Sequence, residues 1–234
     1  MILSLAKWFV DFLESYFGDK KMSRTSRYCS PNIFYHVTQR GNYRQVIFES
    51  DEDKSVYIEY FQDYALEYGM ELYAWCLMSN HVHFIVKPLK DNSLSKVFGV
   101  THMNYSNYFN KKKGAKGHLW QGRFYSCPLE PDHLYEAIRY VELNPYRAKM
   151  VSDVAEFYWS SSHDRLHKTE TIPLSCVKEY IDFPNWRDYL EERFDQQIWD
   201  VIRKQTKSGK PMGSDEFVER INKIRKKFYL VPGK

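Results

Sequence analysis

Two histidines flank a single valine at the start of an apolar segment, in the stretch NHVHFIVKP, residues 80–88. Successive side chains of a strand point to opposite faces, so His81 and His83 share one face while Val82 points to the other. Two imidazoles on one face can bind a single cation. Because the chain has 8 histidines, such a triplet also arises by chance, and a pair of structural histidines is the alternative.

A tyrosine and an asparagine share a helix face further along the chain. Tyr140 and Asn144 lie four residues apart in AIRYVELNPYRA, residues 137–148. A phenol, with a pKa of about 10, attacks phosphorus only where cations polarise the phosphate. Two imidazoles and one oxygen ligand would hold a divalent ion and leave positions open for that phosphate. Together these side chains suggest phosphoryl transfer to a tyrosine.

Both residues also have ordinary structural roles. The chain has 19 tyrosines, and most tyrosines of a protein pack in its core or lie at its surface, so composition does not single out Tyr140. Asn144 directly precedes Pro145, and proline is favoured in the first turn of a helix, which makes Asn144 a candidate N-cap. Cap and metal ligand would compete for the same side-chain oxygen, and the spacing slightly favours the cap.

The elements that must position these residues follow a regular order. Hydrophobic periodicity and turn residues predict a strand, a helix, two strands joined by a tight turn, a helix, a strand and a helix. Their ranges are 32–40, 51–69, 71–78, 81–89, 93–114, 119–130 and 132–143. This order predicts an α+β fold, a ferredoxin-like split βαβ antiparallel sheet with helices on one face. The fold hosts many functions and decides none.

The two ends of the chain differ from this central part. After residue 160 the sequence becomes polar and proline-broken, with two helical segments around a glycine turn, so we expect a main domain at 28–160 and a helical C-terminal extension at 161–234. The two helices are an α-hairpin or, as the less favoured alternative, a DNA-reading helix-turn-helix. Residues 1–27 form an N-terminal extension, and Met22 is an alternative start.

Composition excludes several classes of protein. Four cysteines without a CxxC pair indicate neither a zinc cluster nor a disulfide framework. No apolar stretch is long enough to span a membrane, and the acids within the apolar start do not fit a secretory signal, so we expect a cytoplasmic protein without a membrane partner. The net charge of +4 weakly favours anionic partners. The basic run at 111–123 fits a solvated loop.

An ordered series of motifs resembles one family. NHVHFIV is followed by RYVELNPYRAKMV, and FYHVTQRGNYRQVIF, HLWQGRFY and SGKPMGSDEFVERI complete the series over most of residues 28–220. Together they resemble the REP-associated tyrosine transposases, a branch of the single-tyrosine HUH nucleases. The ordered series is more specific than any one of its motifs.

The resemblance implies a metal-dependent enzyme that cuts and joins single-stranded DNA at repeated hairpins. His81 and His83 would bind Mg²⁺ or Mn²⁺, and the third ligand of the family falls on Asn144. Tyr140 would attack the DNA and form a covalent 5′-phosphotyrosine with a free 3′-hydroxyl. Some members act as monomers, whereas more distant relatives exchange the tyrosine helix between two subunits, so a monomer or a homodimer is expected.

Residues at the strand ends offer contacts to DNA. Cations, an amide and an indole ring gather there in five residues: Arg40, Arg44, Trp120, Gln121 and Arg123. The alternative roles are core packing for the tryptophan and solvated charge for the arginines. Two other functions compete with the transposase: a non-catalytic single-strand-binding module of the same fold, and a metal phosphodiesterase that activates water and does not need the tyrosine.

Overall fold

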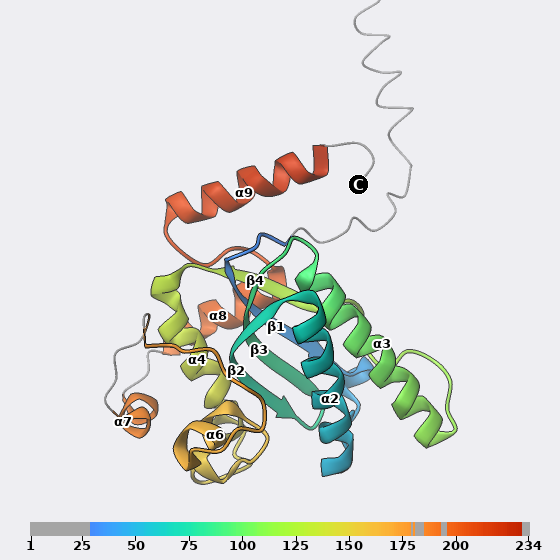
Figure 1. Ribbon diagram of the computed structural model, residues 1–234. Coiled ribbons are helices and arrows are strands. Elements are labelled where there is room, and N and C mark those ends of the chain that lie inside the picture. Colours follow the sequence, from blue (N-terminus) through green and yellow to red (C-terminus); the bar gives the residue numbers. More distant parts are fainter. Residues whose placement is uncertain (1–28, 179, 181–184, 193–195, 231–234) are drawn as a thin grey trace, which may run out of the picture.

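A four-stranded antiparallel sheet forms the centre of the protein. The computed structural model describes residues 29–178, 180, 185–192 and 196–230, so the expected extension of residues 1–27 lies outside the described residues. The strands are β1 (Phe34–Arg40), β2 (Met70–Met78), β3 (His81–Pro88) and β4 (Tyr125–Leu129). Their order across the sheet is β2-β3-β1-β4, with all neighbours antiparallel. This is the predicted split βαβ arrangement, in which β3 lies between β1 and β2 (Figure 1).

Local sequence signals set the bounds of the two long helices. At the start of α2 (Asp51–Tyr68), the Ser50 hydroxyl accepts a hydrogen bond from the Asp53 amide, while the Asp53 carboxylate accepts one from the Ser50 amide. The helix ends at Gly69, whose φ of 72° favours glycine. The second helix, α3 (Ser93–Lys113), ends in the same way at Gly114, with φ 60°. Between the two helices, the predicted two-residue turn joins β2 to β3.

Helices cover both faces of the sheet, not one face as predicted. Helices α2 and α3 pack on the face that carries Trp75 and Phe84. Helices α4 (Leu134–Glu142) and α8 (Gln196–Ser208) pack on the face that carries Ile85 and Cys127 (Figure 1). The strands are apolar on both sides, so both faces must be shielded from water.

Two predicted elements are shorter than expected. Strand β4 begins only at Tyr125, because the preceding residues form a loop that bonds back to the end of β1, with the Gln121 amide donating to the Arg40 carbonyl at 3.0 Å. The helix predicted at 132–143 starts as the 3₁₀ turn η2 (Pro131–His133), and α4 gives way to the short helix α5 (Asn144–Arg147). Pro145 follows the break, as its lack of an amide proton requires.

Two of the C-terminal helices, α6 (Ser161–His167) and α8, pack on the central sheet. The elements beyond α5 are η3 (Val154–Glu156), α6, α7 (Trp186–Glu191), α8 and α9 (Asp215–Leu230). One further element, the 3₁₀ turn η1 (Asn42–Arg44), lies earlier in the chain, directly after β1. Helix α8 lies against β4 and α4, where Trp199 and Ile202 are buried. The division of the chain at residue 160 stays a prediction. The domain that holds the sheet nevertheless depends on α8 to cover one face.

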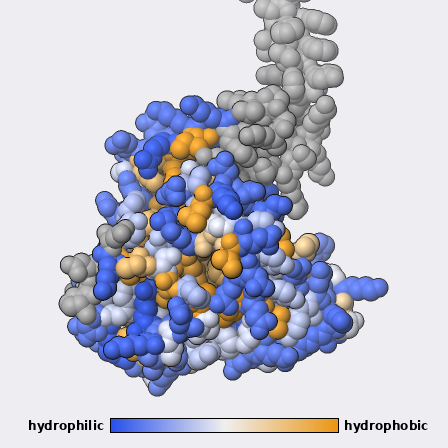
Figure 2. Space-filling model, viewed as in Figure 1, coloured by the Kyte–Doolittle hydropathy of each residue, from blue (hydrophilic) through white to orange (hydrophobic). Residues whose placement is uncertain are grey.

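The face shown in Figure 2 is mostly polar, and the cysteines of the described chain are unpaired. Figure 2 shows that the face turned to the viewer is mostly hydrophilic, with hydrophobic residues exposed in scattered patches. No helix within the described residues is long and apolar enough to cross a membrane. All four cysteines lie in the described part of the chain and are free thiols.

Candidate active site

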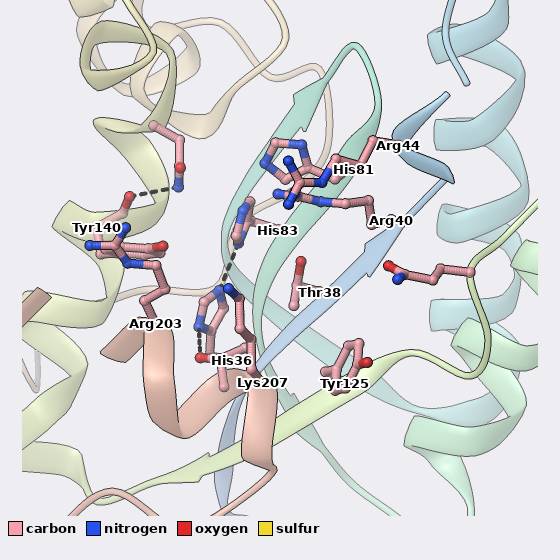
Figure 3. A pocket seen from close by; sticks show the side chains of 13 residues that line it. His36, Thr38, Arg40, Arg44, His81, His83, Tyr125, Tyr140, Arg203 and Lys207 are labelled. Carbon is pink, nitrogen blue, oxygen red and sulfur yellow. Dashed lines mark hydrogen bonds between the residues drawn. The ribbon is translucent and has the colours of Figure 1, made fainter. Parts of the chain in front are cut away.

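One pocket on the side of α4 and α8 collects most of the predicted site residues (Figure 3). Its walls come from β1, β3, β4, α4, α8 and the loops beside them. It is lined by 13 residues: His36, Thr38, Arg40, Arg44, His81, His83, Gln121, Tyr125, Tyr140, Asn144, Arg203, Thr206 and Lys207. Among the residues predicted for the site, Trp120 and Arg123 do not line it.

Strand β3 presents its two histidines to the pocket as the alternation predicts. The ring centroids of His81 and His83 are 5.0 Å apart, while Val82 is fully buried in the core on the opposite face. Burial and the neighbouring Arg40 charge lower the pKa of His81 to about 3. Burial, followed by the nearby His81, lowers the pKa of His83 as well. Both rings are therefore neutral near pH 7, the form that binds metal ions.

Hydrogen bonds of the β2–β3 turn fix the proton of His81. The Asn80 amide nitrogen donates to the Arg44 carbonyl at 3.1 Å, so the Asn80 amide oxygen is the atom that faces the ring. This oxygen is 2.6 Å from the Nδ1 atom of His81 and can only accept. His81 therefore carries its proton on Nδ1, and its Nε2 atom keeps a lone pair.

Helix α4 brings Tyr140 to the histidines of its own chain. The Tyr140 ring centroid lies 5.9 Å from that of His83 and 5.7 Å from that of His36. Figure 3 shows its phenol oxygen on the side of the ring that faces the histidines. The Arg147 guanidinium lies 4.9 Å from the Tyr140 centroid and 4.4 Å from that of Trp199. These contacts hold a ring that is only 5% exposed.

Asn144 does not act as the helix cap that its position before Pro145 suggested. Its amide nitrogen donates to the carbonyls of Tyr140 at 2.8 Å and Val141 at 3.4 Å, at the end of α4. Helix α5 starts after Leu143 and has no side-chain cap. Since both acceptors are carbonyls, the NH₂ group must face them, and the carboxamide oxygen takes part in neither bond. The oxygen is therefore not engaged by a cap.

Four cations surround the pocket, and two of them were not predicted. Arg40 is the last residue of β1 and Arg44 the last residue of the η1 turn that follows it, whereas Arg203 and Lys207 come from α8. Burial and the charge of Arg44 lower the pKa of Arg40. Arg203 forms an ion pair with Asp200. The described lining residues include no carboxylate, so the pocket favours an anionic ligand.

Trp120 lies in the core and offers little surface to a nucleotide base. It is 8% exposed, its ring packs against His102 with centroids 4.6 Å apart, and its indole nitrogen donates to the His102 carbonyl at 2.9 Å. The residue pairs with Gly41 in an isolated bridge, which holds the neighbouring Gln121 at the pocket. Tyr125, which is 38% exposed, lines the pocket. No sequence signal distinguished its ring from that of Trp120.

The donor atoms of the pocket fit a divalent ion of mixed nitrogen and oxygen coordination. Within the described residues, no three His, Cys, Asp or Glu side chains gather in a way that would hold a metal. The set available here has two neutral imidazoles, on His81 and His83, and the amide oxygen of Asn144. Three such ligands leave positions of an octahedral ion to water or to phosphate oxygens.

Comparisons with known proteins find similar transposases. The model of the family described as "Transposase IS200 like" matches residues 29–144. The solved structure of a REP-associated tyrosine transposase bound to a REP hairpin is 19% identical and covers 75% of this chain and 100% of its own, with a TM-score of 0.49. A protein from Deinococcus radiodurans R1 described as a transposase is 18% identical and covers 56% of this chain and 92% of its own, with a TM-score of 0.35. No curated protein matches.

Proposed function

Because the chain belongs to the family of IS200-like transposases, we propose that it cuts and rejoins single-stranded DNA at repeated hairpins through a covalent tyrosine intermediate. The observation that carries the proposal is the 5.9 Å between the ring centroids of Tyr140 and His83 in a pocket lined by four cations. The series of motifs, which resembles that of the REP-associated tyrosine transposases, supports hairpin DNA as the substrate.

The reaction needs a nucleophile and a leaving group on one phosphate. The phenol oxygen of Tyr140 attacks phosphorus, a new O–P bond forms, and the bond from phosphorus to the 3′ oxygen breaks. The phenol loses its proton, the departing 3′ oxygen gains one, and the 5′ phosphate stays on the tyrosine. Attack by a 3′-hydroxyl reverses the step and joins DNA without an energy source.

His81, His83 and Asn144 would hold the metal ion of this reaction, Mg²⁺ or Mn²⁺. When bound, the ion supplies polarisation of the phosphate and charge stabilisation as the phenol attacks. The two imidazoles suit this role because both are neutral. The packing of Arg147 and Trp199 around the Tyr140 ring limits its motion, so the DNA phosphate must come to the tyrosine.

The DNA strand would be held by side chains from two sides of the pocket. Arg40, Arg44 and Gln121 line the side of the pocket formed by β1 and its adjoining loop, and Arg203 and Lys207 line the side formed by α8. Cations in a groove bind a single strand through its phosphates. Arg123 lies beyond this lining, and Trp120 is buried, so we give neither a direct role.

Capture of the adduct tests the proposal. An oligonucleotide that contains a hairpin from the DNA flanking the gene is labelled at its 3′ end, because the 5′ phosphate of that fragment stays on the protein. With Mn²⁺ the wild-type chain should give a labelled protein band on a denaturing gel, and Tyr140→Phe should give none. Tyr125→Phe, in the same pocket, is the matched control and should form the adduct.

Two other outcomes would contradict the proposal. If Tyr140→Phe still nicks the DNA, water is the nucleophile and the protein is a metal phosphodiesterase. If the wild-type chain binds the hairpin with unchanged affinity in EDTA and forms no adduct on any flanking repeat, it is a non-catalytic binding module.

A further inference from the structure

A chain of buried hydrogen bonds runs from α8 to His83 behind the pocket. The Thr206 hydroxyl lies 2.7 Å from the Ile202 carbonyl oxygen and 2.7 Å from the Nδ1 atom of His36. The Nε2 atom of His36 lies 2.9 Å from the Nδ1 atom of His83. Figure 3 shows the two bonds of His36 as dashed lines. These atoms lie up to 170 positions apart in the sequence.

The direction of each hydrogen bond follows from the one group that cannot donate. The Ile202 carbonyl only accepts, so Thr206 gives it its hydroxyl proton and must accept a proton from the Nδ1 atom of His36. A neutral imidazole holds one ring proton, and in His36 the bond to Thr206 places it on Nδ1. Its Nε2 atom then accepts from the Nδ1–H group of His83.

We propose that His36 and Thr206 are positioning residues that fix His83 in its Nδ1–H tautomer and aim the lone pair of its Nε2 atom at the cation site. His81 reaches the same state through a different partner, the amide oxygen of Asn80. Both histidines of β3 therefore donate through Nδ1 and keep Nε2 available. A second partner of this kind sets the ring orientation of a ligating histidine and raises its basicity.

The proposal gives α8 a role in the site beyond its cations. Without the Thr206 hydroxyl, the Nδ1–H group of His36 has no acceptor in the buried core, which costs free energy. His36 then favours a proton on Nε2, and the bond to His83 reverses. A His83 ring that accepts at Nδ1 carries its own proton on Nε2, which blocks the lone pair.

Nitrogen NMR of the histidine rings, recorded without metal or DNA, tests the tautomer directly. In wild-type protein labelled with ¹⁵N-histidine, the His83 signals should be those of an Nδ1–H ring, and His83→Asn assigns them by their loss. Thr206→Ser retains the hydroxyl and should leave the pattern unchanged. Thr206→Val should increase the Nε2–H form of His83.

Metal affinity tests the consequence. Calorimetric titration with Mn²⁺ should give weaker binding for Thr206→Val and for His36→Ala, by roughly 10- to 100-fold. Thr206→Ser should bind like the wild type. His102→Asn is the matched control for the loss of a buried histidine, because His102 bonds to Tyr57 at 3.0 Å in the core on the other face of the sheet.

The outcomes separate this inference from the proposed function, on which its metal-binding part rests. An Nε2–H ring at His83 in the wild-type protein would overturn the inference, whatever the protein does to DNA. Because this measurement is made on the wild-type protein, it does not depend on whether any variant folds. An unchanged tautomer and Mn²⁺ affinity in Thr206→Val would overturn it too. If His83 is an Nδ1–H ring in a protein that forms no DNA adduct, the inference about the tautomer is confirmed and the proposed nuclease function is wrong.

Discussion

Removal of the two α8 cations should weaken the salt dependence of DNA binding by about half. Four cations line the pocket, and each phosphate contact to a single strand contributes about −0.7 to the slope of log affinity against log salt. Four contacts give a slope of about −2.8, and the double variant Arg203→Gln, Lys207→Gln leaves about −1.4. Between 50 and 200 mM salt, affinity should thus fall roughly 50-fold in the parent and roughly 7-fold in the variant.

Fluorescence anisotropy with a labelled hairpin and its single-stranded tail measures this slope. EDTA and a Tyr140→Phe background prevent cleavage in all samples. Lys96→Gln with Lys111→Gln is the control, because both lysines are exposed on α3, which covers the opposite face of the sheet. An unchanged slope in the α8 variant, or an equal decrease in the α3 variant, would refute the assignment of the DNA path.

Three further predictions concern the fold and the metal. Gly41→Ala should destabilise the protein by roughly 1–3 kcal/mol in thermal unfolding, because an added Cβ would lie 2.5 Å from the Gln45 carbonyl oxygen, and it should weaken DNA binding. Asp53→Asn should cost about 2–3 kcal/mol near pH 7, because the buried carboxylate pairs with Lys112 at 2.5 Å. Despite burial, the bonds to Lys112 and to backbone amides lower the Asp53 pKa, so its stabilisation is present above the unfolded pKa of about 3.9 and lost as pH falls through the folded value. In denaturant titrations over pH, the variant and wild type should converge in acid. Asn144→Ala should weaken Mn²⁺ binding in calorimetry while hairpin affinity in EDTA stays near that of the wild type, and equal Mn²⁺ affinity would exclude Asn144 as a ligand.

Local patterns predicted the parts of the site that lie within one element. The alternation along β3 correctly gave His81 and His83 a common face with Val82 behind them. Helical spacing placed Tyr140 and Asn144 together, and both line the pocket. Such predictions succeed because the period of a strand or a helix is set by the backbone, independently of the rest of the fold.

Contacts between segments that are distant in the chain could not be predicted from a single sequence. Nothing near Thr206 indicates that its hydroxyl meets His36, because that contact depends on how α8 docks on β4 and α4. The same docking brings two cations to the pocket and covers the second face of the sheet. The burial of Trp120 could not be predicted either, because an aromatic residue in a loop packs inward or outward according to the space that other helices leave.

The position of Tyr140 depends on an anchor two residues further along α4. Glu142 is fully buried, and its carboxylate accepts hydrogen bonds from three donors: Ser161 Oγ at 2.6 Å, Arg165 Nε at 3.1 Å and Trp186 Nε1 at 2.7 Å. These donors belong to α6 and α7, so α4 is tied to helices that follow it in the chain. A buried carboxylate that loses such partners is costly. An exchange of α4 alone between two subunits would separate Glu142 from all three donors, so the arrangement favours a tyrosine that serves the histidines of its own chain.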